Sequence, residues 1–301
     1  MKTNYGIISD VHQDPRIVEL AINILKNQGA EKLILNGDIG NSQQFVGYVL
    51  NCAGESGIET YVQPGSHERL EDFEPVIKYF QGKYPNLINV FDNRKVSNNC
   101  HDLIFMPGSD FLCGGEYILQ NSEDNISGFY KTDNGFIRLT NMSDLTNLVT
   151  NPDKTIVVCH IPKRFNNLQY GIDVAEFGEV EEDFILDREK VEKGSVYSEH
   201  VAVQIVNAGF PVKLKKENRG SQDLKDIYEK LGIKKSISGH FHESGHKACD
   251  MNGNPVKDNE LTDELFWNAS YCDAGKVGIL SIDGNSNKAS YRNINLQDFL
   301  R

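Results

Sequence analysis

Short apolar runs alternate with helical patterns through the first part of the chain. The apolar run at 5–9 is followed by apolar residues at helical spacing over 17–25. Two further apolar runs stand at 32–36 and 58–63, with a helical pattern near 43–51 between them. Strands that alternate with helices in this way form βαβ units, in which the strands are parallel. The pattern therefore predicts an α/β fold.

Capping residues mark where several elements begin and end. Asp14 followed by Pro15 is the pattern of an N-cap and a first helical residue, so we expect the first helix to begin there. Farther along, Ser221 opens a helical pattern that Gly232 closes. The remaining patterns predict helices at 73–80 and 199–207 and strands at 87–91, 102–106, 155–159, 235–238, 265–269 and 277–282. The last two are expected to be antiparallel strands that finish a sheet.

Two regions interrupt the regular alternation within what we expect to be one domain over 1–301. Residues 109–141 are rich in Gly, Asn, Asp and aromatic residues, which favours hairpins and loops. Residues 165–220 are expected to form an insertion, a lid over the working edge of the sheet. Inside this insertion, 173–192 is strongly acidic and is interpreted as a solvated surface, and 213–219 is interpreted as a basic loop.

Candidate metal ligands follow five of the predicted strands. The five loops carry Asp10 and His12, Asp38, Ser66 and His67, His160, and His240 and His242. A single Asp or His after a strand commonly caps the loop, but parallel strands end at one edge of a sheet, where ligands bind in open α/β folds. Five histidines and two aspartates in one pattern therefore indicate a metal site. Mixed carboxylate and imidazole ligands suit Mn²⁺, Fe or Zn²⁺, of which we favour Mn²⁺.

Composition narrows the class of protein. Hydrophobic residues make up 39% of the chain and charged residues 25%, which is typical of a globular protein with a full core. The formal net charge of −12 argues against a broad electrostatic surface for nucleic acid or anionic membrane. The six cysteines are scattered without a CxxC pair and are expected to be reduced thiols. No apolar run reaches the roughly 18 residues of a membrane span, and no signal peptide is recognisable, so we expect a cytoplasmic protein.

The motifs resemble the five sequence blocks of the calcineurin-like metallophosphoesterases. In the family's order, the blocks are Asp10-x-His12, Gly37-Asp38, Gly65-Ser66-His67-Glu68, His160 and Gly239-His240-x-His242. Each block alone is weak evidence, whereas the set is specific and spans most of the chain. The resemblance implies an α/β/β/α sandwich, with two packed mixed β-sheets flanked by helices and a dinuclear metal centre at the strand tips.

The resemblance also implies roles for the candidate residues. It assigns seven metal ligands: Asp10, His12 and His242 at the first ion, His160, His240 and Ser66 at the second, and Asp38 as the bridge between both. His67 matches the family's catalytic histidine, the general acid that protonates the departing alkoxide. The implied reaction is hydrolysis of a phosphate ester by a metal-bridging hydroxide, held between cations roughly 3.5–4 Å apart.

Two positions depart from the family's pattern. The third block of the family carries Asn where this chain has Ser66, and a short neutral hydroxyl is a poorer ligand, so we expect a weaker second metal site. The second block often carries Asp where this chain has Asn41, so His67 lacks that carboxylate partner. The Gly-Asp-x-x-Asp-Arg-Gly form of the Ser/Thr protein phosphatases is absent, which argues against that branch.

We therefore interpret the chain as a metal-dependent phosphoesterase that acts on a small phosphorylated substrate, with monoester and diester both open. One alternative is a phosphodiesterase of nuclease or cyclic-nucleotide type, although the net charge disfavours nucleic acid. Another is a catalytically weakened binding protein on the same scaffold, which Ser66 and Asn41 would support.

Five further polar residues are expected to lie outside the metal site. We expect structural or surface positions for His101, His200 and His246. Lys163 and Arg164 follow His160 closely enough to meet a phosphate, but we favour solvated loop positions for both.

Overall fold

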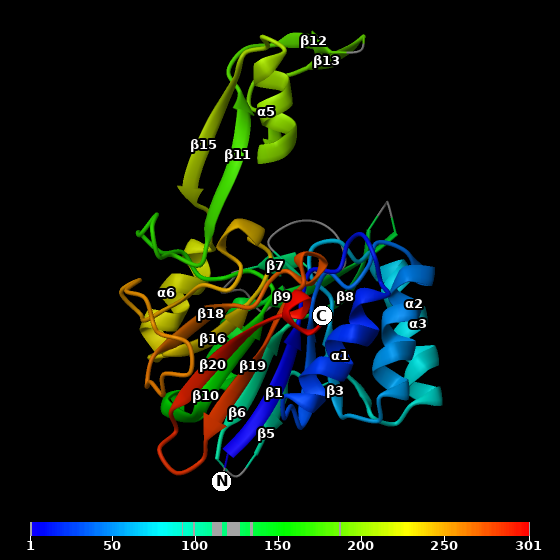
Figure 1. Ribbon diagram of the computed structural model, residues 1–301, viewed down its shortest axis with the longest axis vertical. Helices are drawn as coiled ribbons and strands as arrows, with labels where there is room; N and C mark the ends of the chain where they lie inside the picture. Colours follow the sequence, from blue (N-terminus) through cyan, green and yellow to red (C-terminus); the bar gives the residue numbers. More distant parts are fainter. Residues whose placement is uncertain are drawn as a thin grey trace.

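Two six-stranded mixed sheets pack face to face in the computed structural model, with helices on their outer faces (Figure 1). The structure describes residues 2–91, 93–98, 100–109, 116–118, 127–132, 135–186 and 188–300. The layers follow the order α/β/β/α, which confirms the expected fold class. Among the described residues, none of the helices is long and apolar enough to span a bilayer.

The first sheet has the order β20-β19-β1-β2-β3-β4. Its strands are β1 (Lys2–Ile8), β2 (Lys32–Asn36), β3 (Thr60–Gln63), β4 (Leu87–Asn89), β19 (Lys276–Asp283) and β20 (Ala289–Asn295). Strands β1 to β4 are mutually parallel, whereas β19 and β20 join the sheet antiparallel. Strands β1, β2 and β3 therefore end at one edge, as the βαβ pattern predicts.

The second sheet has the order β17-β18-β16-β10-β6-β5. Its strands are β5 (Lys95–Ser97), β6 (Asp102–Met106), β10 (Thr155–Cys159), β16 (Lys235–Ser238), β17 (Ala248–Cys249) and β18 (Leu265–Asn268). Strands β6, β10, β16 and β18 are parallel, and only the edge strands β5 and β17 run antiparallel to their neighbours. The prediction that the 265–269 run is antiparallel is therefore wrong with respect to β16, because this strand extends the parallel core of the sheet.

Three apolar layers hold the sandwich together. Along β1, Tyr5 and Ile7 face the second sheet, whereas Ile8 faces the helices, as the alternation of a strand requires. The layer between the sheets includes the fully buried Trp267. Helices cover the two outer faces, with α1 (Ile17–Asn27), α2 (Gln43–Glu55) and α3 (Leu70–Lys83) on the first sheet and α4 (Leu145–Leu148) and α6 (Gln222–Leu231) on the second.

The capping predictions have different outcomes at the two helices. The Ser221 hydroxyl accepts from the Leu224 N–H at 3.2 Å, and Gly232 ends α6 with a φ of 70°, which confirms both boundaries. The first helix begins at Ile17 and not at Asp14. The Asp14 carboxylate instead accepts from the Arg16 N–H at 3.0 Å and closes a turn ahead of the helix.

Residues 174–218 form a projection that we call the arm (Figure 1). Its elements are β11 (Val174–Val180), β12 (Phe184–Leu186), β13 (Glu189–Val191), β14 (Val196–Ser198), α5 (Glu199–Asn207) and β15 (Val212–Asn218). Strands β14, β11 and β15 form one sheet, and β12 pairs with β13. The 213–219 segment is therefore a strand for most of its length and not a loop. Whether the arm acts as a lid stays a prediction.

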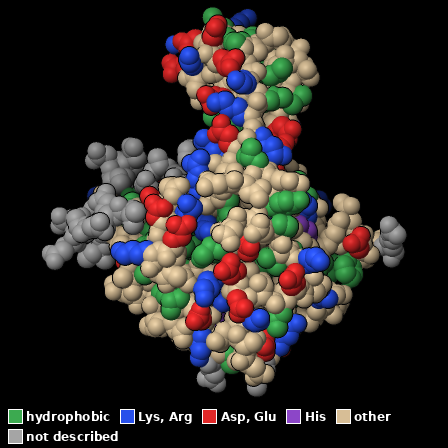
Figure 2. Space-filling model, turned by 90° about the vertical axis from the view of Figure 1, so that its left-hand side faces the viewer, with side chains coloured by type: hydrophobic (Ala, Val, Ile, Leu, Met, Phe, Trp, Pro, Cys, Tyr) green, Lys and Arg blue, Asp and Glu red, His purple; other side chains and the backbone are tan. Residues whose placement is uncertain are grey.

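The arm has a small core of its own and a charged surface. Val180, Ala202, Ile205 and Val212 are buried between α5 and the sheet. Lysine and arginine side chains lie among aspartates and glutamates along the arm and its narrow base (Figure 2). Asp173, at the start of the predicted acidic surface, is in contrast fully buried, so the solvated interpretation is wrong for that residue.

The region predicted to form hairpins contributes a separate three-stranded sheet. Strands β7 (Glu116–Ile118), β8 (Gly128–Thr132) and β9 (Gly135–Asn141) have the order β7-β9-β8, and β8 and β9 form an antiparallel hairpin. Residues 110–115, 119–126 and 133–134 of the 109–141 prediction, and with them Cys113, lie outside the described residues. The described cysteines are free thiols, as expected: Cys52, Cys100, Cys159, Cys249 and Cys272.

Candidate metal centre

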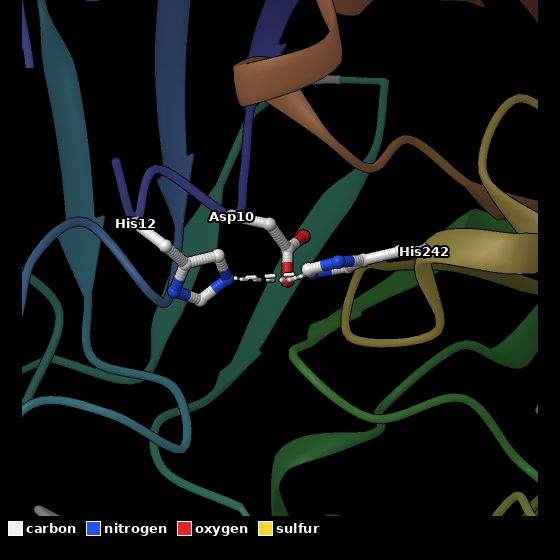
Figure 3. Close-up of side chains that lie close together, drawn as sticks. All are labelled: Asp10, His12 and His242. Atoms are coloured by element: carbon white, nitrogen blue, oxygen red, sulfur yellow. Dashed lines mark hydrogen bonds and ion pairs between the residues drawn. The ribbon is translucent and has the colours of Figure 1, made fainter. Parts of the chain in front are cut away.

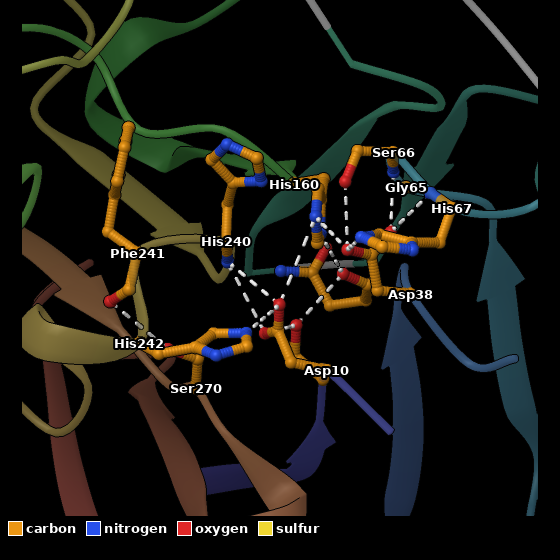
Figure 4. Close-up of polar contacts among 12 residues, drawn as sticks. Asp10, Asp38, Gly65, Ser66, His67, His160, His240, Phe241, His242 and Ser270 are labelled. Carbon is orange, nitrogen blue, oxygen red and sulfur yellow. Dashed lines mark hydrogen bonds and ion pairs between the residues drawn. The ribbon is translucent and has the colours of Figure 1, made fainter. Parts of the chain in front are cut away.

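The loops that follow β1, β2, β3, β10 and β16 meet at one edge of the sandwich (Figure 4). The first two loops are joined by backbone hydrogen bonds, from the Asp10 N–H to the Gly37 carbonyl at 3.2 Å and from the Val11 N–H to the Asp38 carbonyl at 2.6 Å. Asp10, Asp38 and His240 have φ angles of 60°, 53° and 71°, a region that non-glycine residues rarely occupy. Such strain concentrates at functional sites, where the surrounding structure holds it in place.

Asp10, His12 and His242 form a first group of potential ligand atoms (Figure 3). His242 Nε2 lies 3.3 Å from Asp10 Oδ1 and 3.3 Å from His12 Nε2. His12 Nε2 is 3.9 Å from the same carboxylate oxygen. The two imidazoles come from loops 230 residues apart in sequence and converge on one fully buried carboxylate.

Asp38, His160 and His240 form a second group (Figure 4). His160 Nε2 lies 3.0 Å from Asp38 Oδ2, and the rings of His160 and His240 are 5.2 Å apart. The His240 backbone N–H donates to Asp10 Oδ1 at 3.1 Å, so the second group is bonded to the first. Within each group, one ligand atom per residue lies within 4.8 Å of the others.

Asp38 lies between the two groups. Its Oδ2 atom is 4.0 Å from His12 Nε2 and 3.0 Å from His160 Nε2. Asp10 Oδ1 is likewise 4.0 Å from His160 Nε2. The six predicted ligands that are Asp or His therefore form one connected cluster, with Asp38 where a bridging carboxylate would stand.

The surroundings of His160 fit a bound cation. His160 Nδ1 is 3.0 Å from the Asn36 carbonyl, a contact that orients the ring and directs Nε2 toward Asp38. Metal-binding histidines are commonly held in this way through their other nitrogen. His160 Nε2 is buried and has no partner of hydrogen-bond geometry among the described residues. A nitrogen that is buried, oriented and without a hydrogen bond suits a metal ligand.

Electrostatics in the cluster favour ionised carboxylates. Burial opposes ionisation of Asp10 and Asp38, but the neighbouring histidines outweigh it, so the pKa of each carboxyl is lowered, that of Asp38 strongly. Burial would lower the pKa of His160, but the charges of Asp38 and Asp10 raise it to about 10. Burial, aided by the charge of His160, lowers the pKa of His240 to about 4. A divalent cation would therefore displace the proton on His160 and find His240 already neutral.

Two glycines permit the close approach of these loops. Gly37 has a φ of 82°, and a Cβ there would stand 2.7 Å from His160 Nδ1. A Cβ at Gly239 would stand 2.6 Å from Asp10 Oδ2. Both glycines belong to the sequence blocks, so the motif supplies space for the site as well as ligands.

Ser66 and His67 approach the cluster from the loop after β3. The Ser66 hydroxyl donates to Asp38 Oδ2 at 2.8 Å, and the His67 N–H donates to Asp38 Oδ1 at 2.9 Å. The His67 side chain is 56% exposed, and its Nε2 lies 4.0 Å from Asp38 Oδ2. Atoms of His12, Asp38 and His67 form a third group within 4.8 Å. The Ser66 hydroxyl is thus bonded to the predicted bridge, and the His67 ring stands at the open side of the site.

Glu68 joins the loops after β2 and β3. Its carboxylate accepts from the Gly65 N–H at 2.8 Å and from the Ile39 N–H. Burial, with the charge of Asp38, raises the pKa of Glu68 to about 8. Both oxygens of the Glu68 carboxylate therefore accept hydrogen bonds from these two loops.

Three histidines outside the blocks lie away from the cluster, as expected. His101 is buried against the Tyr5 hydroxyl at 2.7 Å, and His246 Nε2 is 2.9 Å from the Val277 carbonyl. His200 is exposed on the arm. Their contacts are structural or at the surface.

Lys163 differs from its prediction, whereas Arg164 is exposed as expected. The Lys163 side chain is 1% exposed, and its Nζ lies 4.5 Å from the ring centroids of both Phe165 and Phe266. It also donates to the Met251 carbonyl at 3.3 Å. Cation–π contacts hold this ammonium inside the protein, so it is neither a solvated loop charge nor a phosphate ligand.

Sequence reasoning did not single out three residues that support the site. Asn36 receives the His160 contact, Asp273 accepts from the His12 N–H at 2.8 Å, and the Tyr271 ring stacks on His242 at 4.4 Å. Asn36 ends the apolar run of β2, and the other two follow β18. Asn36 could have been found from its place at the end of a strand, whereas Tyr271 and Asp273 follow a strand whose direction depends on its pairing with β16, which no local pattern shows.

The sequence matches the family profile of calcineurin-like phosphoesterases over residues 3–244. This match covers most of the chain and contains all five loops. The chain belongs to the calcineurin-like phosphoesterase family. A search of curated proteins found no significant match. Membership of the family confirms the resemblance read from the five blocks.

Two solved structures support the fold. The protein TT1561 of Thermus thermophilus is similar with a TM-score of 0.57 and 9% identity, over 98% of this chain and 100% of that one. A second crystal structure aligns with a TM-score of 0.54 and 11% identity, over 97% and 99% of the two chains. The purple acid phosphatase PPD1 from yellow lupin (Lupinus luteus) seeds aligns with a TM-score of 0.45 and 10% identity, over 100% of this chain and 55% of that one.

Proposed function

We propose that this protein hydrolyses a phosphate ester with two divalent metal ions. One observation carries the proposal: two groups of ligand atoms, Asp10 with His12 and His242 and Asp38 with His160 and His240, lie in one cluster joined through Asp38. The donors are carboxylate oxygens and imidazole nitrogens, which suit Mn²⁺, Fe or Zn²⁺, and we favour Mn²⁺. The family's activity on phosphoesters is consistent with this arrangement.

The chain's own residues divide the work of the reaction. When bound, the metal ions would supply an activated water and neutralise charge on the phosphate oxygens. Asp38 stands between the two groups and would fix their separation, while the Asn36 carbonyl keeps His160 directed at them. His67 is the exposed group next to the cluster, and it would donate the proton to the leaving alkoxide.

The second metal site is proposed to be the weaker one. Ser66 occupies the position of a family ligand, and its hydroxyl, which donates to Asp38 Oδ2, is short and neutral and therefore a poorer ligand for a cation than the carboxylates and imidazoles of the cluster. We therefore expect two Mn²⁺ affinities that differ.

Hydrolysis assays with added Mn²⁺ test the proposal and separate its versions. We expect release of p-nitrophenol from p-nitrophenyl phosphate, loss of this activity with a chelator, and its return with Mn²⁺. Hydrolysis of bis(p-nitrophenyl) phosphate but not of the monoester would show that the protein is a phosphodiesterase and not a phosphomonoesterase. Because the net charge is −12, we propose a small substrate and not nucleic acid.

A binding protein on the same scaffold is the second candidate. Ser66 favours it, because a short neutral hydroxyl is a poor ligand for the second ion, and a protein that binds only one ion at this site would not complete a two-metal mechanism. Less than one metal ion per chain after Mn²⁺ loading, with no turnover of either ester, would establish this alternative.

A further inference from the structure

A sixth loop reaches the metal centre from beyond the part of the chain that matches the family. Residues 269–275, which we call the sixth loop, follow β18, and β18 is parallel to β16. The loop therefore leaves the sheet at the same edge as the five loops with candidate ligands. It begins 25 residues after the end of the family match at 244.

The sixth loop binds the loop that carries His12. The Cys272 N–H donates to the Ser9 carbonyl at 2.9 Å. The Asp273 carboxylate accepts through Oδ2 from the His12 N–H at 2.8 Å and from the Gln13 N–H at 3.1 Å. These bonds fix the backbone of His12 from a residue 261 positions away in sequence.

The same loop and the end of β18 hold His242 from the other side. The Tyr271 and His242 rings stack with centroids 4.4 Å apart and an angle of 10° between their planes. The Asn268 side-chain amide donates to the Phe241 carbonyl at 2.9 Å. The Ser270 hydroxyl donates to the same carbonyl at 3.4 Å (Figure 4). The residue before His242 is therefore bonded to β18, and the His242 ring is covered by an aromatic face.

We propose that the sixth loop positions His12 and His242 as ligands of the first metal ion, with Asp273 and Tyr271 as its positioning residues. Asp10 is fully buried and fixed by its surroundings, but His12 and His242 are 21% and 35% exposed in their side chains. Partly exposed side chains have rotamer freedom that must be removed before they can share one ion. Asp273 fixes the backbone that carries the His12 ring, and Tyr271 packs on the ring of His242. This inference rests on the metal binding in the proposed function.

Titration of the metal-free protein with Mn²⁺ by isothermal calorimetry tests the inference. Asp273→Ala should weaken one of the two binding steps by about 10–100-fold, as loss of a residue that supports a ligand commonly does. Asp273→Asn keeps an oxygen that accepts the same N–H groups and should stay within about threefold of wild type. Tyr271→Ala should weaken the same step by about 2–10-fold, the value of an aromatic pair, whereas Tyr271→Phe should leave it unchanged.

Asp250→Ala is the matched control. The Asp250 carboxylate also accepts from two backbone N–H groups, at 2.8 Å and 2.9 Å, but within its own turn after β17. The thermal midpoint of the metal-free Asp250→Ala protein should fall about as much as that of Asp273→Ala. The affinities of both Mn²⁺ binding steps should stay unchanged in Asp250→Ala. His240→Ala identifies the other step, because His240 belongs to the second group.

Three outcomes separate the inference from the proposed function. If Asp273→Ala binds Mn²⁺ as tightly as Asp250→Ala, the sixth loop is a structural element and the inference is overturned. If both binding steps weaken equally in Asp273→Ala, its role is not specific to the first group, which also overturns it. If the wild-type protein binds no Mn²⁺, Fe²⁺ or Zn²⁺, the proposed function and the inference both fail.

Discussion

The metal centre and the arm contain the same types of charged residue with opposite surroundings. At the centre, Asp10 and Asp38 are almost fully buried among histidines that come from separate loops. On the arm, the ion pair of Lys215 and Glu179 at 2.7 Å bridges neighbouring strands at the surface, and Lys216 and Glu176 form another. Buried carboxylates that lie among imidazoles favour the binding of a cation, whereas paired surface charges already neutralise each other.

The difference teaches that position in the sheet decides the chemistry of a charged residue. Every predicted ligand follows a parallel strand at the edge where the loops meet, and those loops are fixed by glycines and backbone hydrogen bonds. Four of the seven residues of β15 are charged, and Lys215 and Lys216 pair with glutamates of β11 at the surface. Counting acidic or basic residues would have ranked the arm above the metal centre.

The largest expected effect is at Asp38. Asp38→Ala removes the carboxylate between the two groups, and we expect kcat/KM for a phosphate ester to fall by about a thousandfold or more, since this loss corresponds to several kcal/mol of charge stabilisation. Asp14→Ala, in the turn before α1, is the control and should keep full activity. An Asp38→Ala protein with a tenth of wild-type activity would contradict the bridging role.

His67 should show a smaller loss that depends on the leaving group. His67→Ala should lower kcat about 10²–10⁴-fold for an alkyl phosphate, whose alkoxide needs a proton, and far less for p-nitrophenyl phosphate. His200→Ala on the arm is the matched control and should change neither rate. Equal losses for both leaving groups would show that His67 is not the general acid.

A substitution at the base of the arm should lower the stability of the protein without changing its affinity for metal. The Asp173 carboxylate accepts from the Phe165 N–H at 2.9 Å, the Gly220 N–H at 3.1 Å and the Asn218 amide at 2.7 Å, so it joins both ends of the arm. Asp173→Ala leaves these donors unpaired and should lower the free energy of unfolding in urea by about 1–3 kcal/mol. A loss of Mn²⁺ affinity would mean that the arm's base is part of the metal site.

The smallest expected effect is at the surface ion pairs of the arm. Lys216→Ala removes the pair with Glu176, and we expect the free energy of unfolding in urea to change by less than about 1 kcal/mol, because both side chains are partly in solvent. A double-mutant cycle with Glu176→Ala measures the coupling free energy between the two side chains directly. A coupling free energy above about 2 kcal/mol would show that the ion pairs between β11 and β15, and not the apolar core of the arm, hold the arm together.

The same contrast explains which features could be predicted from the sequence. The five ligand loops were recognisable because each follows a short apolar strand and carries its residues within a few positions. The sixth loop was missed because the direction of β18 depends on its pairing with β16, which no local pattern shows. Strand β15 was missed because four of its seven residues are charged, three of them in succession, which hides the alternation of a strand. Buried Lys163 was missed because Phe266 lies far away in sequence.

Crystals grown with Mn²⁺ and measured at the manganese absorption edge test the central claim most directly. The account predicts two anomalous peaks, one among Asp10, His12 and His242 and one among His160 and His240, with Asp38 in contact with both. The second peak should have the lower occupancy, because the neutral Ser66 hydroxyl is a poorer ligand than the carboxylates and imidazoles of the cluster. The absence of any manganese peak at these residues would contradict the account.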